Sequence, residues 1–157
     1  MNKVYLHRRL AADQYLGRVD AAGKVYESRL GPDKYIGRVD LESGKIYESR
    51  MGPDKLLGRV DAESGKVYLD RFGPDEYLGR VHRDGKLYQH RSLASDEYLG
   101  RVEELASLVH GGGAFLLLVL PAYDQEAEAA RADQEDEARQ GREAEEPPDA
   151  GEAPAPA

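Results

Sequence analysis

The stretch GPDKYIGRVDLESGKIYESRM, residues 31–51, recurs along the chain with a period of about 20 to 21 residues. Whole or partial copies flank it on both sides: NKVYLHRRL (2–10), AADQYLGRVDAAGKVYESRL (11–30), GPDKLLGRVDAESGKVYLDRF (52–72), GPDEYLGRVHRDGKLYQHRSL (73–93) and ASDEYLGRVEEL (94–105). A period of this length is too short for two helices and fits a two-stranded hairpin with two turns.

Each unit contains two strand-like segments bounded by turn residues. Residues 35–40 and 45–50 are rich in β-branched and aromatic side chains, which favour strands. Gly31-Pro32-Asp33 and Ser43-Gly44 are typical of turns, because proline fixes φ and glycine accepts a positive φ. Five Gly-Pro-Asp-type hairpins joined by Gly-Lys turns therefore predict an all-β, antiparallel meander of about ten short strands.

The turn lengths predict which side chains share a face of the sheet. The Gly-Pro-Asp loop, taken as four residues, places Tyr26 opposite Val39, and the two-residue turn before Tyr26 places Val19 opposite it. A slip of one residue would invert every side chain, so the agreement of the two turns favours tyrosines and valines on one face. Glutamates and arginines then share the other face, in exposed pairs such as Glu27–Arg38.

One tyrosine and one glycine recur in every unit and are expected to be structural. They are Tyr5, Tyr26, Tyr47, Tyr68 and Tyr88, and Gly17, Gly37, Gly58, Gly79 and Gly100. We expect each glycine to let a neighbouring ring lie over the backbone. Tyr5 and Val102 occupy equivalent positions at the two ends of the series, so the strands 3–9 and 98–102 can pair. The prediction is a barrel or toroid, with an open sheet as the alternative.

Composition divides the chain into a hairpin-repeat domain (1–102), an apolar helical segment (103–121) and an acidic tail (122–157). The net charge is −8, and the tail alone holds 12 acidic and 3 basic residues, so the rest is nearly balanced. Neither part has the clustered basic surplus of a nucleic-acid-binding surface. Within the tail, 123–146 predicts a marginal, solvated helix and 147–157 predicts disorder; its expected role is solubility, or docking of a basic partner.

The apolar segment predicts a short helix at 105–110, an interruption at Gly111-Gly112-Gly113, and an apolar run, Ala114–Leu120, that ends at Pro121. Three interpretations of the segment stay open. It plugs or covers the barrel, whose own side chains fill it poorly. It packs against a second copy of the chain. Or residues 105–123 anchor the chain in a membrane, with bilayer contact through the apolar run.

The chemistry-bearing residues favour no enzyme class. The sequence contains no phosphate-binding loop, nucleophile elbow or His-Glu-x-x-His pattern, and we expect neither catalytic residues nor a cofactor. His7, Asp70 and His90 are candidate metal ligands, because each follows a strand tyrosine by two residues and all share a layer if the ring closes. The absence of cysteine and of an N-terminal apolar signal predicts a cytoplasmic location, with membrane association as the alternative.

The unit G-P-D-x-Y-[LI]-G-R-V-D-x-x-S-G-K-[VI]-Y resembles the hairpin repeats of bacterial proteins described as β-flower domains. The resemblance covers residues 3–102, with five hairpins where the β-flower has four, and the unit is distantly similar to MORN repeats. It implies a fold and no catalytic residues. We therefore expect a non-enzymatic structural or interaction module whose partner is another protein or a second copy. The alternative is a membrane-tethered cytoplasmic accessory protein.

Overall fold

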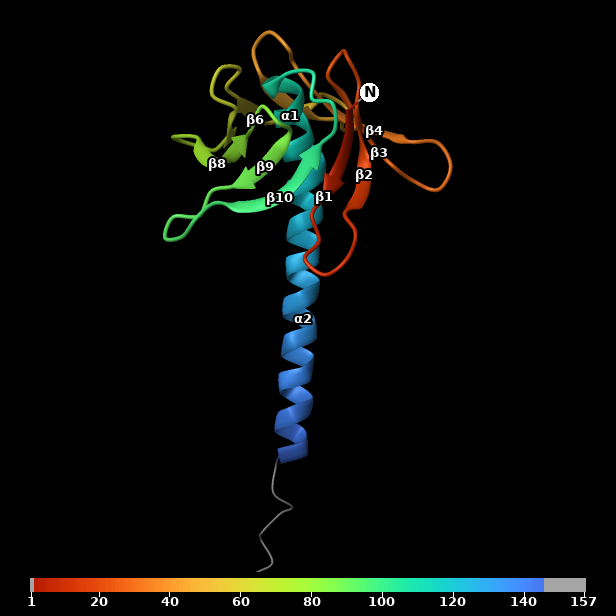
Figure 1. Cartoon of the computed structure of the whole chain (residues 1–157), viewed down its shortest axis with the longest axis vertical. Coiled ribbons are helices and arrows are strands. Elements are labelled where there is room, and N and C mark those ends of the chain that lie inside the picture. The colour runs from red at the N-terminus through yellow and green to blue at the C-terminus, as the bar shows by residue number, and fades with distance from the viewer. Residues whose placement is uncertain (1, 146–157) are drawn as a thin grey trace, which may run out of the picture. The chain divides into compact units, whose positions relative to one another are not determined.

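Ten antiparallel strands form a closed barrel in the computed structural model of the chain (Figure 1). The structure describes residues 2–145, and their side chains as far as residue 141. The strands follow the sequence around the ring: β1 (Asn2–Leu6), β2 (Gln14–Val19), β3 (Lys24–Glu27), β4 (Lys34–Val39), β5 (Lys45–Glu48), β6 (Lys55–Val60), β7 (Lys66–Leu69), β8 (Glu76–Val81), β9 (Lys86–Gln89) and β10 (Glu97–Val102). Strand β1 pairs with β10, where Val4 lies opposite Val102. The predicted all-β meander and its closure are confirmed.

The connections between strands are of two kinds and lie at opposite ends of the barrel. Each odd-numbered strand leads to the next strand through a long loop, and these loops splay outward in Figure 1. Each even-numbered strand from β2 to β8 leads on through a shorter turn. In the first of these, the Asp20 carboxylate accepts hydrogen bonds from the backbone N–H groups of Ala22 and Lys24, at 3.0 and 2.9 Å. Side-chain bonds of this kind are what make aspartate a turn residue.

The predicted register is wrong at both kinds of turn, by one residue across the short turn and by three to four residues across the long loop. Tyr26 pairs with Arg18 on one side, and Val25 lies opposite Val19. On the other side the loop is longer than four residues, and a β-bulge places Val25 opposite Gly37 and Tyr26 opposite Tyr35. The aliphatic residue before each tyrosine therefore points into the barrel with the valines, and the tyrosines lie on the outer surface. A one-residue slip changes which side chains share a face of the sheet, and the slip at the short turn places tyrosines and valines on opposite faces.

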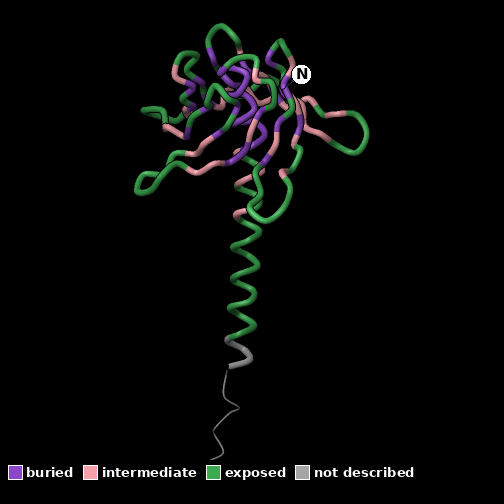
Figure 2. Tube along the Cα trace, viewed as in Figure 1, coloured by how far each residue is buried: buried purple, intermediate pink, exposed green. Residues whose placement is uncertain are grey.

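A helix fills the barrel (Figures 1 and 2). After β10 the chain turns at Glu104, with φ +52°, and enters the lumen as α1 (Leu108–Ala114). It continues as a π-helical turn, η1 (Phe115–Val119), and then as α2 (Leu120–Glu145). Every residue from 108 to 119 is buried. Of the three interpretations of the apolar segment, the plug is the one that matches this arrangement. The segment shares one core with the barrel and is no separate region.

The helix fits the barrel through two complementary layers of small and large residues. Gly111-Gly112-Gly113 does not interrupt the helix, contrary to the prediction, but forms the interior of α1. An added methyl at these glycines would lie 2.4, 2.4 and 3.0 Å from Val81, Val60 and Val39. One turn later the sizes are exchanged: Phe115, Leu116 and Leu117 lie 3.0–3.1 Å from where a methyl group on Gly79, Gly58 and Gly37 would stand. Helix glycines thus meet strand valines, and large helix residues meet strand glycines.

The π turn explains how the helix passes Pro121. A proline inside a helix lacks an N–H group, and its ring clashes with the carbonyl four residues earlier. Directly before it, the chain widens into η1, and the Leu120 N–H donates to the Phe115 carbonyl five residues back. The predicted end of the helical segment at residue 121 is therefore wrong, because the wider turn accommodates the proline.

The chain divides into two compact units, Met1–Tyr123 and Asp124–Ala157. In the second unit, α2 continues to Glu145, and most of its described side chains are exposed. This agrees with the predicted solvated helix. The predicted disorder of 147–157 lies outside the described residues. Among residues 2–145, no helix is long and apolar enough to cross a bilayer. The proposed contact run Ala114–Leu120 is packed inside the barrel except at its last residue.

Candidate functional site

The three candidate metal ligands do not come together. The Nδ1 atoms of His7 and His90 lie 3.2 and 3.4 Å from carboxylate oxygens of Asp13 and Asp96, each in its own hairpin. Each imidazole also lies against a tyrosine of the neighbouring hairpin, with ring centroids 4.7 Å apart for His7–Tyr98. Within residues 2–145, no group of three histidine, aspartate or glutamate side chains is placed to hold a metal ion.

The repeated tyrosines form a belt around the outside of the barrel. Arginine guanidinium groups lie over four of the rings, at 4.0–4.2 Å from the centroids: Arg18 over Tyr26, Arg38 over Tyr47, Arg59 over Tyr68 and Arg101 over Tyr5. Tyr88 instead packs against His82, with centroids 4.6 Å apart. Tyr35 and Tyr77 lie opposite Tyr26 and Tyr68 on the neighbouring strands. Burial raises the pKa of their hydroxyl groups. The belt is a packed surface of cation–π contacts, so these tyrosines are structural, though on the face opposite to the predicted one.

The five repeated strand glycines are packed closely against a neighbouring strand. At each of them, the atom nearest to an added methyl group would be a backbone oxygen of that strand. A methyl group at Gly58 would lie 2.0 Å from the backbone oxygen of Tyr68 and 3.1 Å from Leu116 of the lumen helix. The equivalent position at Gly17 is 2.0 Å from the oxygen of Tyr26. These glycines permit close approach of a neighbouring strand and, at Gly58, of the helix.

Five large apolar side chains stand at the ends of the five long loops, which we call the apolar tips. They are Leu10, Leu30, Met51, Phe72 and Leu93, with relative exposures of 99–111%. Each occupies the same place in its hairpin, directly before the Gly-Pro-Asp segment or its counterpart. Isolated exposed apolar residues are ordinary on protein surfaces, but five at equivalent positions with full exposure are a repeated feature of the fold.

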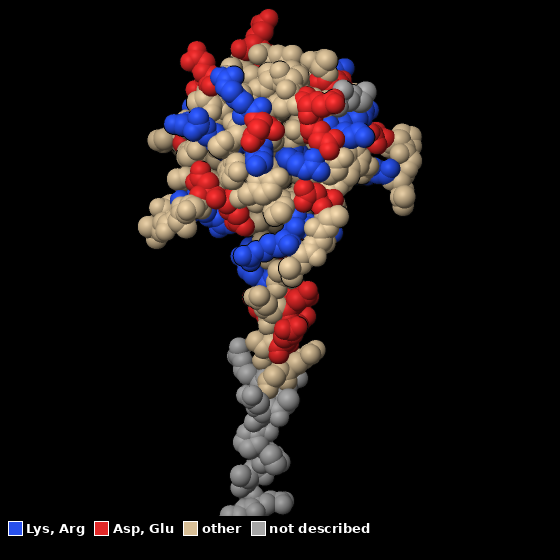
Figure 3. Space-filling model, in the orientation of Figure 1, with Lys and Arg blue, Asp and Glu red and all other residues tan. Residues whose placement is uncertain are grey.

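The bases of the loops are held by ion pairs between neighbouring hairpins. The Nε atom of Arg18 in β2 donates to the carboxylate of Asp33 at 2.9 Å, and Arg59 in β6 reaches Asp75 at 3.1 Å. Asp54 and Asp13 are bound in the same way, by Arg38 and Arg101. These contacts replace the predicted Glu27–Arg38 type of pair. On the face drawn in Figure 3, acidic and basic side chains intermingle over the barrel. Order at the base combined with exposure at the tip makes four of the five loops a fixed support for one apolar side chain.

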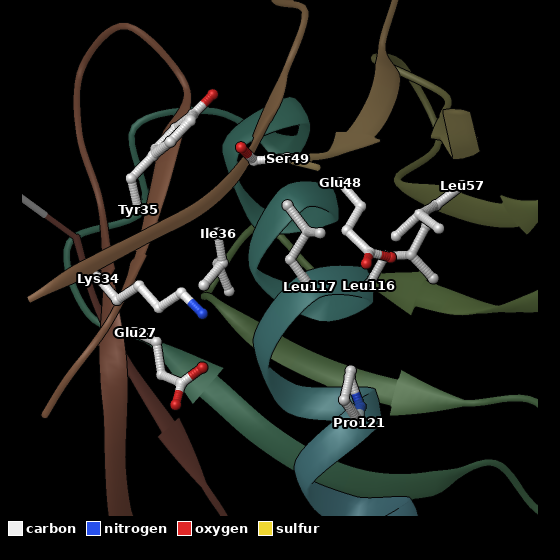
Figure 4. Close-up of a pocket in the computed structure, with 10 residues that line it drawn as sticks. All are labelled: Glu27, Lys34, Tyr35, Ile36, Glu48, Ser49, Leu57, Leu116, Leu117 and Pro121. Carbon is white, nitrogen blue, oxygen red and sulfur yellow. The ribbon is translucent and has the colours of Figure 1, made fainter. Parts of the chain in front are cut away.

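A cavity of about 310 Å³ opens at the end of the barrel from which the long loops project (Figure 4). We call it the mouth pocket. Its apolar lining comes from β4, β6 and the lumen helix: Ile36, Leu57, Leu116, Leu117 and Pro121. Its polar lining is Glu27, Lys34, Tyr35, Glu48 and Ser49. In Figure 4, Glu27 and Lys34 lie on one side of the pocket, and Glu48 lies on the other. The pocket thus combines a leucine-rich floor with two carboxylates and one ammonium group.

The opposite end of the barrel holds a second cavity of similar volume, lined by Glu63, Ser64, Arg80, Val81, His82, Arg83 and Leu108. Nearby, the buried His110 has both ring nitrogens occupied: Nδ1 lies 2.7 Å from the Ser107 hydroxyl, and Nε2 lies 3.1 Å from the Ala21 carbonyl. Since Ser107 also caps the start of α1, this cluster fixes the point at which the helix enters the barrel.

Comparison of the chain with protein-family models, curated proteins and solved structures gives no match. The likeness to β-flower repeats therefore stays a resemblance in the sequence pattern. The apolar tips were not predicted from the sequence, although a signal was present. In every unit one large apolar residue follows the strand and precedes the turn, where neither a strand nor a tight turn requires it.

Proposed function

We propose that this protein is a non-enzymatic interaction module. In this proposal the helix-filled barrel is a rigid support, and the apolar tips are the elements that contact a partner. The full exposure of an apolar residue at all five equivalent loop positions carries the proposal. Burial of one such side chain contributes about 1.5–3 kcal/mol, so several tips engaged together would supply substantial binding energy.

The support for the tips is consistent with this role. A side chain that must bind a partner is most effective when its loop is already ordered, because less conformational entropy is then lost on binding. The ion pairs of Arg18, Arg38, Arg59 and Arg101 order four of the five loop bases. The membrane-anchor alternative would require residues packed in the lumen, such as Phe115, to leave the barrel core.

The test compares the native protein with a variant that has serine at all five tips, in extracts of the cells from which the protein comes. We expect the native chain to migrate in assemblies larger than its 17.4 kDa mass, and the five-serine variant to migrate as a free monomer. Leu41→Ser is the matched control, because Leu41 is an exposed apolar residue at the opposite end of the barrel. Identical migration of the native chain and the five-serine variant would refute the proposal, provided that both have the same circular dichroism spectrum.

A further inference from the structure

We propose that the second cavity, at the opposite end of the barrel from the apolar tips, binds a phosphate group carried by a small molecule. We call this cavity the turn pocket, because the β6–β7 and β8–β9 turns form most of its wall. In this proposal the guanidinium groups of Arg80 and Arg83 and the hydroxyl group of Ser64 bind the phosphate oxygens. The proposal goes beyond the proposed function, since it assigns a small anionic ligand to a part of the barrel that the tips do not use.

Arg80 departs from the arrangement of the equivalent arginines in the other hairpins. Each of those arginines lies over a tyrosine ring and binds an aspartate of a neighbouring hairpin; they are Arg18, Arg38, Arg59 and Arg101. Among the described residues, Arg80 has neither contact. Its Nε atom instead donates to the backbone carbonyl of Ser64 at 2.9 Å. The terminal nitrogens of Arg80 bind no other residue of the described chain, so they are available to a ligand in the turn pocket.

The turn that follows Arg80 carries basic residues that its backbone does not need. His82 and Arg83 stand where the first unit has Asp20 and Ala21. The two turns nevertheless have the same length and the same pair of backbone hydrogen bonds, at 2.9–3.0 Å. The Arg83 side chain forms no hydrogen bond or ion pair with any described residue, so its guanidinium group is also available to a ligand.

The charged groups of the turn pocket favour an anion. Its lining contains two guanidinium groups and one carboxylate, that of Glu63, so its formal charge is +1 with histidine counted as neutral. Asp61 and Asp84 of the adjoining turns do not line the pocket, and their carboxylates accept hydrogen bonds from backbone N–H groups of their own turns. Among the described residues, Glu63 forms no ion pair with either arginine. The positive charge of the pocket is therefore not neutralised by an ion pair within the described chain.

The donors of the pocket suit a phosphate group better than a carboxylate. The planar N–H fork of a guanidinium group matches two oxygens of a phosphate, and such charge-assisted hydrogen bonds are strong. The Ser64 hydroxyl accepts from the Lys66 N–H at 3.3 Å and keeps its own proton for donation. Three separate donor groups match the three terminal oxygens of a phosphate monoester, whereas a carboxylate has only two oxygens.

The size and the floor of the pocket favour a phosphate that is attached to an organic group. The volume of about 310 Å³ is roughly ten times that of one water molecule in the liquid, so a phosphate group alone leaves part of it empty. Val81 and Leu108 supply apolar surface against which the carbon atoms of an ester can pack; they are 1% and 7% exposed. Because both arginines are exposed to solvent, we expect a weak affinity, with a Kd of about 1 mM.

The test is a titration of the ¹⁵N-labelled full chain with glycerol 3-phosphate up to about 20 mM, followed by NMR of the backbone and arginine Nε–H signals. The ionic strength is held constant, so that general screening of charges does not contribute. We expect saturable shifts confined to residues 61–66 and 80–86. Inorganic phosphate and acetate are titrated in parallel, and both should bind more weakly than the ester.

Two variants and one control assign the binding to the turn pocket. The double substitution His82→Asp, Arg83→Ala gives the fourth unit the residues that the first unit has at these positions, so we expect an unchanged fold. It should weaken binding at least tenfold, and so should Arg80→Gln. Arg59→Gln is the matched control, because Arg59 is the equivalent arginine of the preceding repeat and is bound to Asp75; binding should not change.

Three results would overturn the proposal. One is a set of shifts that grows linearly with the ester to the highest concentration, and another is equal binding by the double variant and the native chain. The third is a response to acetate or to inorganic phosphate as strong as the response to the ester, which would assign the pocket to carboxylates or to the free ion. None of these results bears on the apolar tips, so the proposed function stands or fails by its own test.

Discussion

Replacement of Gly112 by alanine should destabilise the barrel by about 2 kcal/mol, although the same change stabilises most helices. Alanine is favoured over glycine within a helix by about 1 kcal/mol. Here, however, the new methyl carbon would lie 2.4, 2.5 and 2.7 Å from three side-chain carbons of Val60. Val60 is 3% exposed and belongs to the sheet, so it has little room to move. Overpacking of a core costs about 1–3 kcal/mol and occasionally more, and three such contacts justify the upper end.

Thermal unfolding followed by circular dichroism measures this effect. At roughly 4 °C per kcal/mol for a domain of this size, the Tm of Gly112→Ala should fall by about 8 °C. Gly141→Ala in α2 is the matched control, because no atom lies within 4 Å of its added methyl group; we expect an unchanged Tm for the barrel. A Gly112→Ala protein as stable as the native one would refute the helix-in-barrel packing.

A double substitution isolates the cause. Val60→Ala alone leaves a cavity and should destabilise the protein. Combined with Gly112→Ala, the new methyl group occupies the space that Val60 vacates. We therefore expect the two free-energy changes to sum to about 1–2 kcal/mol more than the loss in the double variant. Strict additivity would mean that these two residues do not touch.

Three further substitutions test other contacts. Gly58→Ala should destabilise the barrel by about 3 kcal/mol or more in urea titrations, because its methyl would lie 2.0 Å from the Tyr68 carbonyl oxygen, which the sheet holds in place. Ser107→Ala should cost about 1 kcal/mol by the same assay, through loss of the cap that accepts from the His110 N–H. For Asp13, burial raises the pKa, but hydrogen bonds from Arg101 and His7 outweigh it and hold the pKa below its ordinary value. Its stabilising effect is therefore present above the unfolded pKa and is lost as the pH falls through the folded one. Asp13→Asn should flatten the fall of Tm below about pH 4.

The number of strands and the closure of the ring could be predicted because each follows from a local feature that repeats. The Gly-Pro-Asp and Gly-Lys segments mark turns wherever they occur, and the pairing of β1 with β10 follows because these strands are the two halves of one repeat unit. The facing of the side chains could not be predicted in the same way. It depends on a short turn that is one residue longer than predicted, and on the bulge between Val25 and Tyr26, which adds a residue to one strand without any change in the turn residues.

The continuous helix of the apolar segment could not be predicted because of its three glycines. In an isolated helix, three consecutive glycines are strongly unfavourable, so local propensity predicts an interruption at Gly111. Tertiary packing overrides this preference, because the valines of β4, β6 and β8 leave no space for a side chain at these positions. The same three strands supply Gly37, Gly58 and Gly79 to the next layer, where the helix carries large side chains. The pattern is visible in the sequence only once the two segments are known to touch.

The lumen helix also breaks the symmetry of the ring, so equivalent positions of the repeats have different surroundings. The last residue of each odd-numbered strand pairs with a strand glycine at the mouth of the barrel. In β1, β3, β5, β7 and β9 this residue is Leu6, Glu27, Glu48, Leu69 and Gln89, respectively. A ring of identical repeats needs no such variation for its own stability. The two carboxylates occur in adjacent hairpins, and the mouth pocket lies in the sector that they border. Charge and cavity therefore coincide in one sector, whereas the apolar tips occur in all five hairpins. In the proposed function, the apolar tips supply affinity, and this sector distinguishes one partner side chain from another.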